Sequence, residues 1–496
     1  MTYNAPLSLY TIIILSIKEA NLLKKQPNLL FIFADQWRRQ ATGFSNQDSI
    51  FTPNIDQLAQ SGTVLTQAIS SCPLCSPYRG SLFTGKYPLS NGVYTNCKTG
   101  LDITLKDEET CLSDLLKTYG YQTGYIGKWH LDVPEQNHTA DPLSGAHDWD
   151  AYTPPGPKRH HFDFWYSYGA DDHHLTPHYW TDSPEQIKVN EWSITHETSV
   201  AIDYINTHHH SPFALFLSYN PPHSPYDLVP EKYLNIYKDR PLLSRKNVIC
   251  DTIGYHTHEP QTYTQAELET MTKQYFAAIT GLDEHIGLLV DCLKSNDAYE
   301  DTLIIITADH GDMMGSHGLM AKHVWYEESI GIPFILHWKN GALTSGTSDI
   351  VLDTTDIMPT LLDLLSIPKP NTLQGQSIAT YLTSNDLQRP SDKVGYMCAF
   401  PGRTVFQEQF DAVHLDPKDW GWRGIRTRDY TFVVHLGYLP ECTTPTRYLY
   451  NLKTDPYQLN PIAENTSEYQ TIVPLLEAQL KTWLISQDDC FIKWLD

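Results

Sequence analysis

Short, continuously apolar runs alternate with amphipathic stretches along the first three quarters of the chain. The apolar runs lie at residues 28–34, 122–127, 213–219 and 302–308. Runs without polar alternation are typical of strands that are buried on both faces. Stretches with helical spacing lie between them, at 54–62, 111–120 and 265–296. Strands that alternate with helices predict an α/β fold with a large mixed, mostly parallel sheet flanked by helices.

The pattern changes near residue 385. A polar stretch typical of a linker begins there, and an aromatic-rich strand candidate (430–438) and an amphipathic helix (470–486) follow. We therefore predict two units, a large α/β domain over residues 26–385 and a smaller C-terminal α+β domain over residues 386–496 that contains an antiparallel sheet.

Each of the four apolar runs is followed by polar residues of the kinds that bind metals or anions. These are Asp35, Gln36, Lys128, His130, His223, Asp309 and His310. Open α/β sheets bind their ligands outside the carboxyl ends of the strands. The sequence therefore predicts that these side chains meet at one edge of the sheet.

The segment "CSPYRGSLFTG" (75–85) predicts a short helix that begins at Cys75 and ends at Gly85. Cys75 would lie at the helix N-terminus, which favours an anion, and Arg79 would lie on the same helix face. A thiolate activated by the helix dipole is one interpretation. A zinc or redox pair with Cys72 is weaker, because no second Cys-x-x-Cys pair follows. Two small buried thiols explain the pair best.

Composition limits the remaining possibilities. The chain has 496 residues and a formal net charge of −23, which argues against a nucleic-acid partner and means that an anionic substrate would need a locally positive site. Nine cysteines do not suggest a disulfide framework. The apolar segment near the N-terminus is too short to span a bilayer. It fits a poor signal peptide, a mis-chosen start or an ordinary first helix, and no later segment predicts a stable membrane span.

Six motifs resemble those of the type I sulfatases, in the alkaline-phosphatase-like superfamily. "CSPYRG" (75–80) matches the Cys-x-Pro-x-Arg core, and "GYIGKWHL", "PPHSPY", "TADHGDMMGSHGLMAKHVWYEESIGIPFI", "DIMPTLLDLLSIPKP" and "LYNLKTDPYQLNPIA" follow in the family's order. The resemblance covers roughly residues 27–463. It implies a sulfuric ester hydrolase in which Cys75 is oxidised to formylglycine (3-oxoalanine), an aldehyde whose hydrate is the nucleophile.

The resemblance also implies a metal site. Asp35, Gln36, Asp309, His310 and an oxygen of the modified Cys75 would bind a divalent cation, most often Ca²⁺ in this family. The Asp35-Gln36 and Asp309-His310 pairs stand where the family more often has Asp-Asp and Asp-Asn. A histidine ligand also allows Mn²⁺ or another divalent metal. The same variant occurs in phosphonate monoester and phosphodiester hydrolases of the superfamily, which is one alternative function. A non-catalytic carbohydrate-binding relative is another, although the intact Cys75–Arg79 set argues against it.

Further roles are implied residue by residue. Arg79 would hold the hydrate and the sulfate, and Lys128 and Lys322 would contact the sulfate oxygens. His130 would hydrogen-bond the hydrate, and His223 would protonate the leaving alcohol or steady its oxygen. His317 would either help to position the nucleophile or only order its loop.

The irregular, histidine-rich and aromatic-rich segment 154–180 is the best candidate for substrate specificity. Arg159, His173, His174 and Arg403 are candidates to bind a neighbouring sulfate or carboxylate. The expected partners are a sulfated oligosaccharide or polysaccharide and a formylglycine-generating maturation enzyme. We expect a periplasmic or secreted protein, with the cytoplasm left open because no clear signal peptide is present. The sequence leaves open the sulfated ring position, exo or endo action, and the oligomeric state.

Overall fold

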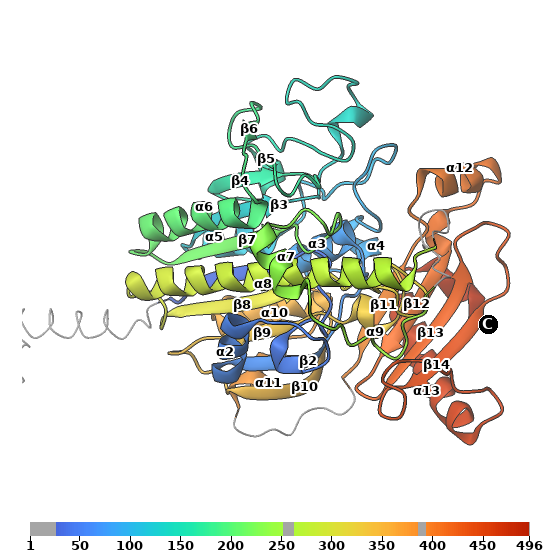
Figure 1. Cartoon of the computed structure of the whole chain (residues 1–496). Coiled ribbons are helices and arrows are strands. Elements are labelled where there is room, and N and C mark those ends of the chain that lie inside the picture. The colour runs from blue at the N-terminus through green and yellow to red at the C-terminus, as the bar shows by residue number, and fades with distance from the viewer. Residues whose placement is uncertain (1–25, 251–261, 385–392, 496) are drawn as a thin grey trace, which may run out of the picture.

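The computed structural model describes residues 26–250, 262–384 and 393–495 (Figure 1). The N-terminal apolar segment lies outside the described residues, as does the expected boundary between the two units. Among the helices that are described, none combines the length and the apolar character needed to cross a membrane.

The large sheet has eight strands in the order β10-β2-β9-β8-β1-β7-β3-β4. Their bounds are β1 (Asn28–Ala34), β2 (Thr63–Ala68), β3 (Gln122–Lys128), β4 (Phe164–Tyr168), β7 (Phe213–Tyr219), β8 (Thr302–Ala308), β9 (Phe334–His337) and β10 (Gly346–Leu352). Only β9 runs antiparallel to its neighbours. The four predicted strands are confirmed, and they are adjacent and parallel in the order β8-β1-β7-β3.

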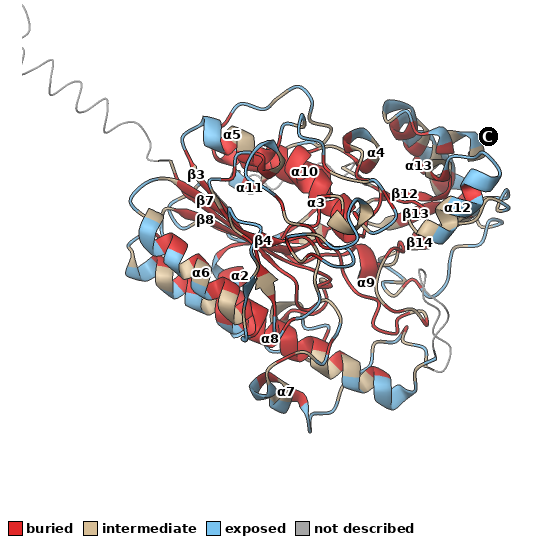
Figure 2. Ribbon diagram, turned by 90° about the horizontal axis from the view of Figure 1, so that it is seen from above, coloured by how far each residue is buried: buried red, intermediate tan, exposed pale blue. Residues whose placement is uncertain are grey.

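Helices cover both faces of this sheet, which is why every residue of β1, β7 and β8 is buried (Figure 2). One group contains α2 (Pro53–Ser61), α6 (Ser193–His208), α7 (Glu231–Tyr237) and α8 (Gln265–Ser295). The other contains α3 (Cys75–Thr84), α5 (Leu112–Thr118), α10 (Thr354–Leu364) and α11 (Ala379–Thr383). The predicted 265–296 helix is confirmed as α8, whose N-terminus is closed by a capping box between Thr264 and Glu267.

Short elements complete the large unit. They are α4 (Pro88–Asn91), α9 (Glu327–Ile330), and the two-stranded ribbon of β5 (His178–Tyr179) and β6 (Ile187–Lys188).

The C-terminal part contains the predicted antiparallel sheet, in the order β11-β12-β13-β14. Its elements are β11 (Gly395–Ala399), α12 (Thr404–Ala412), β12 (Gly421–Arg426), β13 (Tyr430–Gly437), β14 (Thr446–Asn451) and α13 (Ser467–Ser486). The apolar core of this sheet also contains Cys72, Leu74 and Tyr87, which come from the large unit. The segment that leads into α3 is therefore packed between the two sheets.

Candidate active site

The predicted residues meet at the carboxyl ends of four strands. Ala34 is in register with Ala308 on one side and with Tyr219 on the other, so Asp35, Asp309 and Asn220 leave the sheet side by side. Lys128 ends β3. The expectation that these strands carry the site to one edge of the sheet is thus confirmed.

Asp35 and Asp309 form a buried carboxylate pair above Arg79. Arg79 Nη2 donates to Asp35 Oδ2 (3.3 Å) and to Asp309 Oδ2 (3.4 Å), and Lys128 Nζ donates to Asp35 Oδ2 (2.7 Å). Burial alone would raise the pKa of Asp35, but Lys128 and its cationic neighbours hold that pKa well below its usual range. Burial and Asp35 raise the pKa of Asp309 to about 7, so the second negative charge of the pair is incompletely compensated.

His310 and Cys75 complete a four-residue cluster suited to a cation. The ligand atoms of Asp35, Cys75, Asp309 and His310 all lie within 4.8 Å of one another, and all four residues are buried. His310 Nδ1 faces the Gly311 carbonyl oxygen (3.0 Å), which directs the Nε2 lone pair towards Asp35 Oδ1 (3.5 Å) and Cys75 Sγ (3.4 Å). Metal-binding histidines are oriented in this way by a hydrogen bond from their other ring nitrogen. The donor set therefore fits a divalent cation.

Gln36 lies beside this cluster in a left-handed backbone conformation (φ 69°). Its Nε2 donates to Asp312 Oδ2 (2.6 Å) and Tyr226 Oη (3.2 Å), which fixes Oε1 as the acceptor end of the amide. Lys322 Nζ donates to that oxygen. Asp312 also accepts from the backbone N–H groups of Met314 and Ala321, so it orders the loop that carries Lys322.

Cys75 is the first residue of α3, and Gly85 ends this helix in a left-handed conformation, as predicted. Burial and Asp35 raise the pKa of the Cys75 thiol to about 12. This shift favours the neutral thiol in an unmodified Cys75 and argues against a dipole-activated thiolate. All nine cysteines are free, so Cys72 and Cys75 form no disulfide.

His130 lies close to the start of α3, because Ser76 Oγ donates to its carbonyl oxygen (2.7 Å). Its Nε2–H donates to the Cys97 carbonyl oxygen (3.0 Å), while Nδ1 is buried without a partner among the described residues. Burial and Lys128 lower the pKa of His130 well below its usual value, so the ring is neutral. Nδ1 is consequently a buried acceptor, which fits a hydroxyl group on a modified residue 75.

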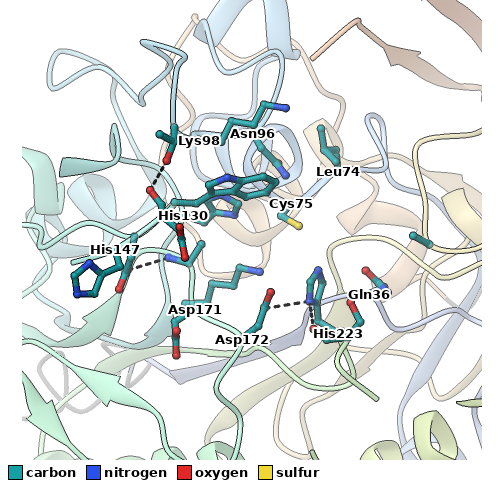
Figure 3. A pocket seen from close by; sticks show the side chains of 18 of the residues that line it. Gln36, Leu74, Cys75, Asn96, Lys98, His130, His147, Asp171, Asp172 and His223 are labelled. Carbon is teal, nitrogen blue, oxygen red and sulfur yellow. Dashed lines mark hydrogen bonds and ion pairs between the residues drawn. The ribbon is translucent and has the colours of Figure 1, made fainter. Parts of the chain in front are cut away.

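His223 is held by a carboxylate that the sequence analysis missed. His223 Nδ1 lies 3.2 Å from Asp172 Oδ1 and 2.7 Å from the Ser224 carbonyl oxygen, while Nε2 lies 3.0 Å from Lys322 Nζ (Figure 3). Two acceptors at Nδ1 place a proton there. Asn220 Nδ2 in turn donates to Asp172 Oδ1 (3.0 Å). Partial desolvation alone would raise the pKa of Asp172, but the neighbouring His223 lowers that pKa far below the usual range.

These groups surround a cavity of about 1010 Å³ whose lining includes Gln36, Cys75, Lys128, His130, His223 and Lys322. In the view of Figure 3, Cys75 lies between Lys98, Asn96 and His130 on one side and Gln36 and His223 on the other. Arg79 is fully buried beneath the carboxylates and does not line the cavity.

The structure contradicts two of the predicted substrate contacts. Arg159 is 5% exposed, and its donors are taken up by Asp182 and by the carbonyl oxygens of Thr153 and Thr181. His174 is buried and donates from Nε2 to the His223 carbonyl oxygen (2.9 Å), so it supports the His223 loop.

The other three uncertain residues have distinct places. His173 is exposed and Arg403 half-buried, and both line the cavity. His317 does not line the cavity. Its ring stacks on Tyr326 with the ring centres 3.8 Å apart, and its Nε2–H donates to the Tyr457 carbonyl oxygen (3.0 Å). These contacts favour the loop-ordering alternative for His317.

The sequence matches the family model for Sulfatase over residues 27–367, and a second model, N-sulphoglucosamine sulphohydrolase, C-terminal, over residues 315–485. The chain belongs to the sulfatase family. It is therefore a sulfuric ester hydrolase.

Two curated relatives cover most of this sulfatase. An endo-4-O-sulfatase of Bacteroides thetaiotaomicron is 33% identical over 94% of this chain and 93% of its own length. An ulvan-active sulfatase of Formosa agariphila is 30% identical over 94% of this chain and 82% of its own.

Solved structures support the same fold. A sulfatase structure (4S-sulf) from a study of glycosaminoglycan metabolism by Bacteroides thetaiotaomicron has a TM-score of 0.82 and 32% identity, and covers 95% of this chain and 98% of its own. The phosphonate monoester hydrolase of Agrobacterium radiobacter has a TM-score of 0.69 with 20% identity over 93% of this chain and 96% of its own, and it shows the shared fold alone.

Proposed function

We propose that this sulfatase removes sulfate from a sulfated carbohydrate. The observation that carries the proposal is the position of Cys75, which opens into a cavity of about 1010 Å³ between a cation-binding cluster and two lysines. Such a volume is at the upper end for small-molecule sites and accommodates a sugar chain better than a small aryl or alkyl ester. Two relatives, one named an ulvan-active sulfatase and the other an endo-4-O-sulfatase, support a sulfated carbohydrate as the substrate class.

Two groups would complete the site. Oxidation of Cys75 to formylglycine would supply, as its hydrate, the nucleophile for the sulfur atom. Asp35, Gln36, Asp309 and His310 would bind a divalent cation, for which we propose Ca²⁺ because three of the four offer oxygen ligands, and the cation would supply Lewis-acid stabilisation of the sulfate oxygens. The incompletely compensated carboxylate pair and the unpartnered His130 Nδ1 support this completion.

The residues of the chain perform the remaining steps. The bond between sulfur and the ester oxygen breaks, one water is consumed, and the products are sulfate and the sugar alcohol. Lys128 and Lys322 bring positive charge to the cavity, where it stabilises the negative charge that develops on the sulfate. His223 Nε2 faces the cavity and is the atom from which the leaving oxygen receives its proton. Asp172, at Nδ1, steadies the charged imidazole.

The test combines a mass measurement with an activity assay. The protein is produced with and without a co-expressed formylglycine-generating enzyme, the peptide that contains residue 75 is weighed, and sulfate release from sulfated oligosaccharides is followed by ion chromatography. We expect sulfate release in proportion to the modified fraction, and none from Cys75→Ala. Equal release by Cys75→Ala, or no release from any sulfate ester by fully modified protein, would overturn the proposal.

A further inference from the structure

Two cations outside the metal cluster, Lys98 and Arg403, line the cavity. Lys98 is half-buried, and its Nζ lies 5.6 Å from the centre of the Trp149 ring. Burial and the neighbouring Arg403 guanidinium lower the pKa of Lys98 to about 8. Among the described residues, no carboxylate forms an ion pair with Lys98, although the cavity is otherwise rich in aspartates.

Three of the four aspartates that line the cavity have other partners. Asp150 accepts from His178 (2.7 Å), Asp171 from His173 (2.6 Å), and Asp172 lies 3.2 Å from His223. Figure 3 shows Asp171 and Asp172 on the opposite side of the view from Lys98. Among the described residues, none of these aspartates is ion-paired with Lys98, which brings positive charge to the cavity.

The part of the cavity lined by Lys98 adjoins the reaction centre through His130. The His130 ring donates to the carbonyl oxygen of Cys97, the residue before Lys98, and it stacks on Trp149 with the ring centres 6.3 Å apart. Trp149 lines the cavity and is 40% exposed, so it offers an apolar surface between the lysine and the centre. An apolar surface flanked by cations suits a sugar ring that carries an acidic group.

We propose that Lys98 and Arg403, with Trp149, form a subsite for an anionic substituent, a carboxylate or a second sulfate, on the sugar next to the one that loses its sulfate. This inference rests on the proposed function. The guanidinium can bind such a group through two parallel hydrogen bonds, while the ammonium acts as a point charge. Since the whole chain carries a formal charge of −23, local cations are needed to hold a polyanion at this position.

The substrates that test the subsite differ only in the neighbouring group. The first is a chondroitin 4-sulfate oligosaccharide with its uronate carboxylates intact, the second is the same oligosaccharide after reduction of the carboxylates to alcohols, and the third carries an added sulfate on the uronic acid. The aryl ester 4-nitrophenyl sulfate, which has no neighbouring sugar, is the reference. Lys98→Met removes the charge and keeps the stem, and Arg403→Gln removes the second charge. Lys238→Gln removes an exposed charge at the C-cap of α7 and is the matched control.

We expect Lys98→Met and Arg403→Gln each to lower the ratio of kcat/KM for the anionic oligosaccharide to kcat/KM for the aryl ester by about 10- to 100-fold, the value of a hydrogen bond between charged groups. Reduction of the carboxylates should produce a similar loss in the wild type and remove the effect of both variants. A larger effect on the oligosaccharide with the added sulfate would assign the subsite to sulfate rather than carboxylate. Lys238→Gln should leave all ratios unchanged.

A binding measurement separates this proposal from the proposed function. Calorimetric titration of the same oligosaccharides into Cys75→Ala reports the subsite without turnover. Equal affinities for the intact and the reduced oligosaccharide, or equal losses on every substrate in Lys98→Met, would overturn the subsite while sulfate release by the wild type continues. Absence of sulfate release from all esters would instead overturn the proposed function.

Discussion

Asp172 is expected to act through His223, and Asp172→Asn tests this with little change of shape. The variant keeps an oxygen that can accept from His223 Nδ1 or from Asn220, but it removes the negative charge 3.2 Å from the imidazole. A protonated imidazole becomes less favourable, so proton donation to the leaving oxygen becomes harder.

The size of the effect follows from distance and exposure. Unit charges 3.2 Å apart interact by about 5 kcal/mol at an effective dielectric constant of about 20. The Asp172 side chain is 51% exposed, so solvent screens much of this interaction. We expect about 1.4 kcal/mol to remain, which corresponds to about a tenfold fall in kcat for a sugar sulfate.

The assay uses leaving groups of graded acidity. A good leaving group, such as 4-nitrophenol, needs little protonation, so Asp172→Asn should slow a sugar sulfate much more than 4-nitrophenyl sulfate. Asp171→Asn removes the same charge from the neighbouring residue, which pairs with His173, and is the matched control.

A double-mutant cycle decides whether the path runs through His223. In a His223→Ala background, Asp172→Asn should cost almost nothing further, because the group that it supports is absent. Equal losses for good and poor leaving groups, or full additivity with His223→Ala, would refute the reasoning.

Three further predictions concern charge and metal. Lys128→Ala should lower kcat by about 10²–10³-fold, as for loss of one transition-state donor, while Tm shows whether the broken contact with Asp35 also weakens the fold; an unchanged kcat would contradict the role of Lys128. Chelation with EDTA should abolish sulfate release and lower Tm, and Ca²⁺ should restore both; restoration by Mn²⁺ alone would assign the cation differently. Glu327 joins the two units through Arg426 Nε (2.8 Å) and Arg39. Although burial opposes it, Arg426 and Arg39 lower the pKa of Glu327 from 4.5 to about 2, so its contribution of about 3 kcal/mol is present above pH 4.5 and is lost as pH falls towards 2. The difference in Tm between the wild type and Glu327→Gln should therefore shrink from pH 7 to pH 3, and a difference that is independent of pH would contradict this linkage.

The central strands of the large sheet could be predicted because each one is a continuous apolar run in the sequence. Strands β1, β3, β7 and β8 are continuous apolar runs, and the strand-end rule then places Asp35, Lys128, His223 and Asp309 together. Strands nearer the ends of the sheet gave no such signal. For example, β10 ("GTSDIVL") begins with exposed polar residues, and β9 has only four residues.

The wall of the cavity could not be predicted, because composition does not fix side-chain direction in an irregular loop. Arg159 and His174 come from the segment that looked most like a specificity loop, yet both point into the protein. Asp172, which contacts His223, was not predicted, although the next two residues, His173 and His174, were predicted as substrate contacts from the composition of this segment. Lys98 belongs to no motif, and it is recognisable only through what surrounds it in space.

The packing of Cys72, Leu74 and Tyr87 into the core of the small sheet has a consequence for protein engineering. The two sheets are not separable modules, because the residues just before and just after α3 belong to the core of one sheet while the cation cluster belongs to the other. A truncation library that ends before β11 would expose these apolar side chains and loosen the turn that presents Cys75. Gene fusions and chimeras of this sulfatase should therefore exchange cavity loops and leave the junction between the sheets intact.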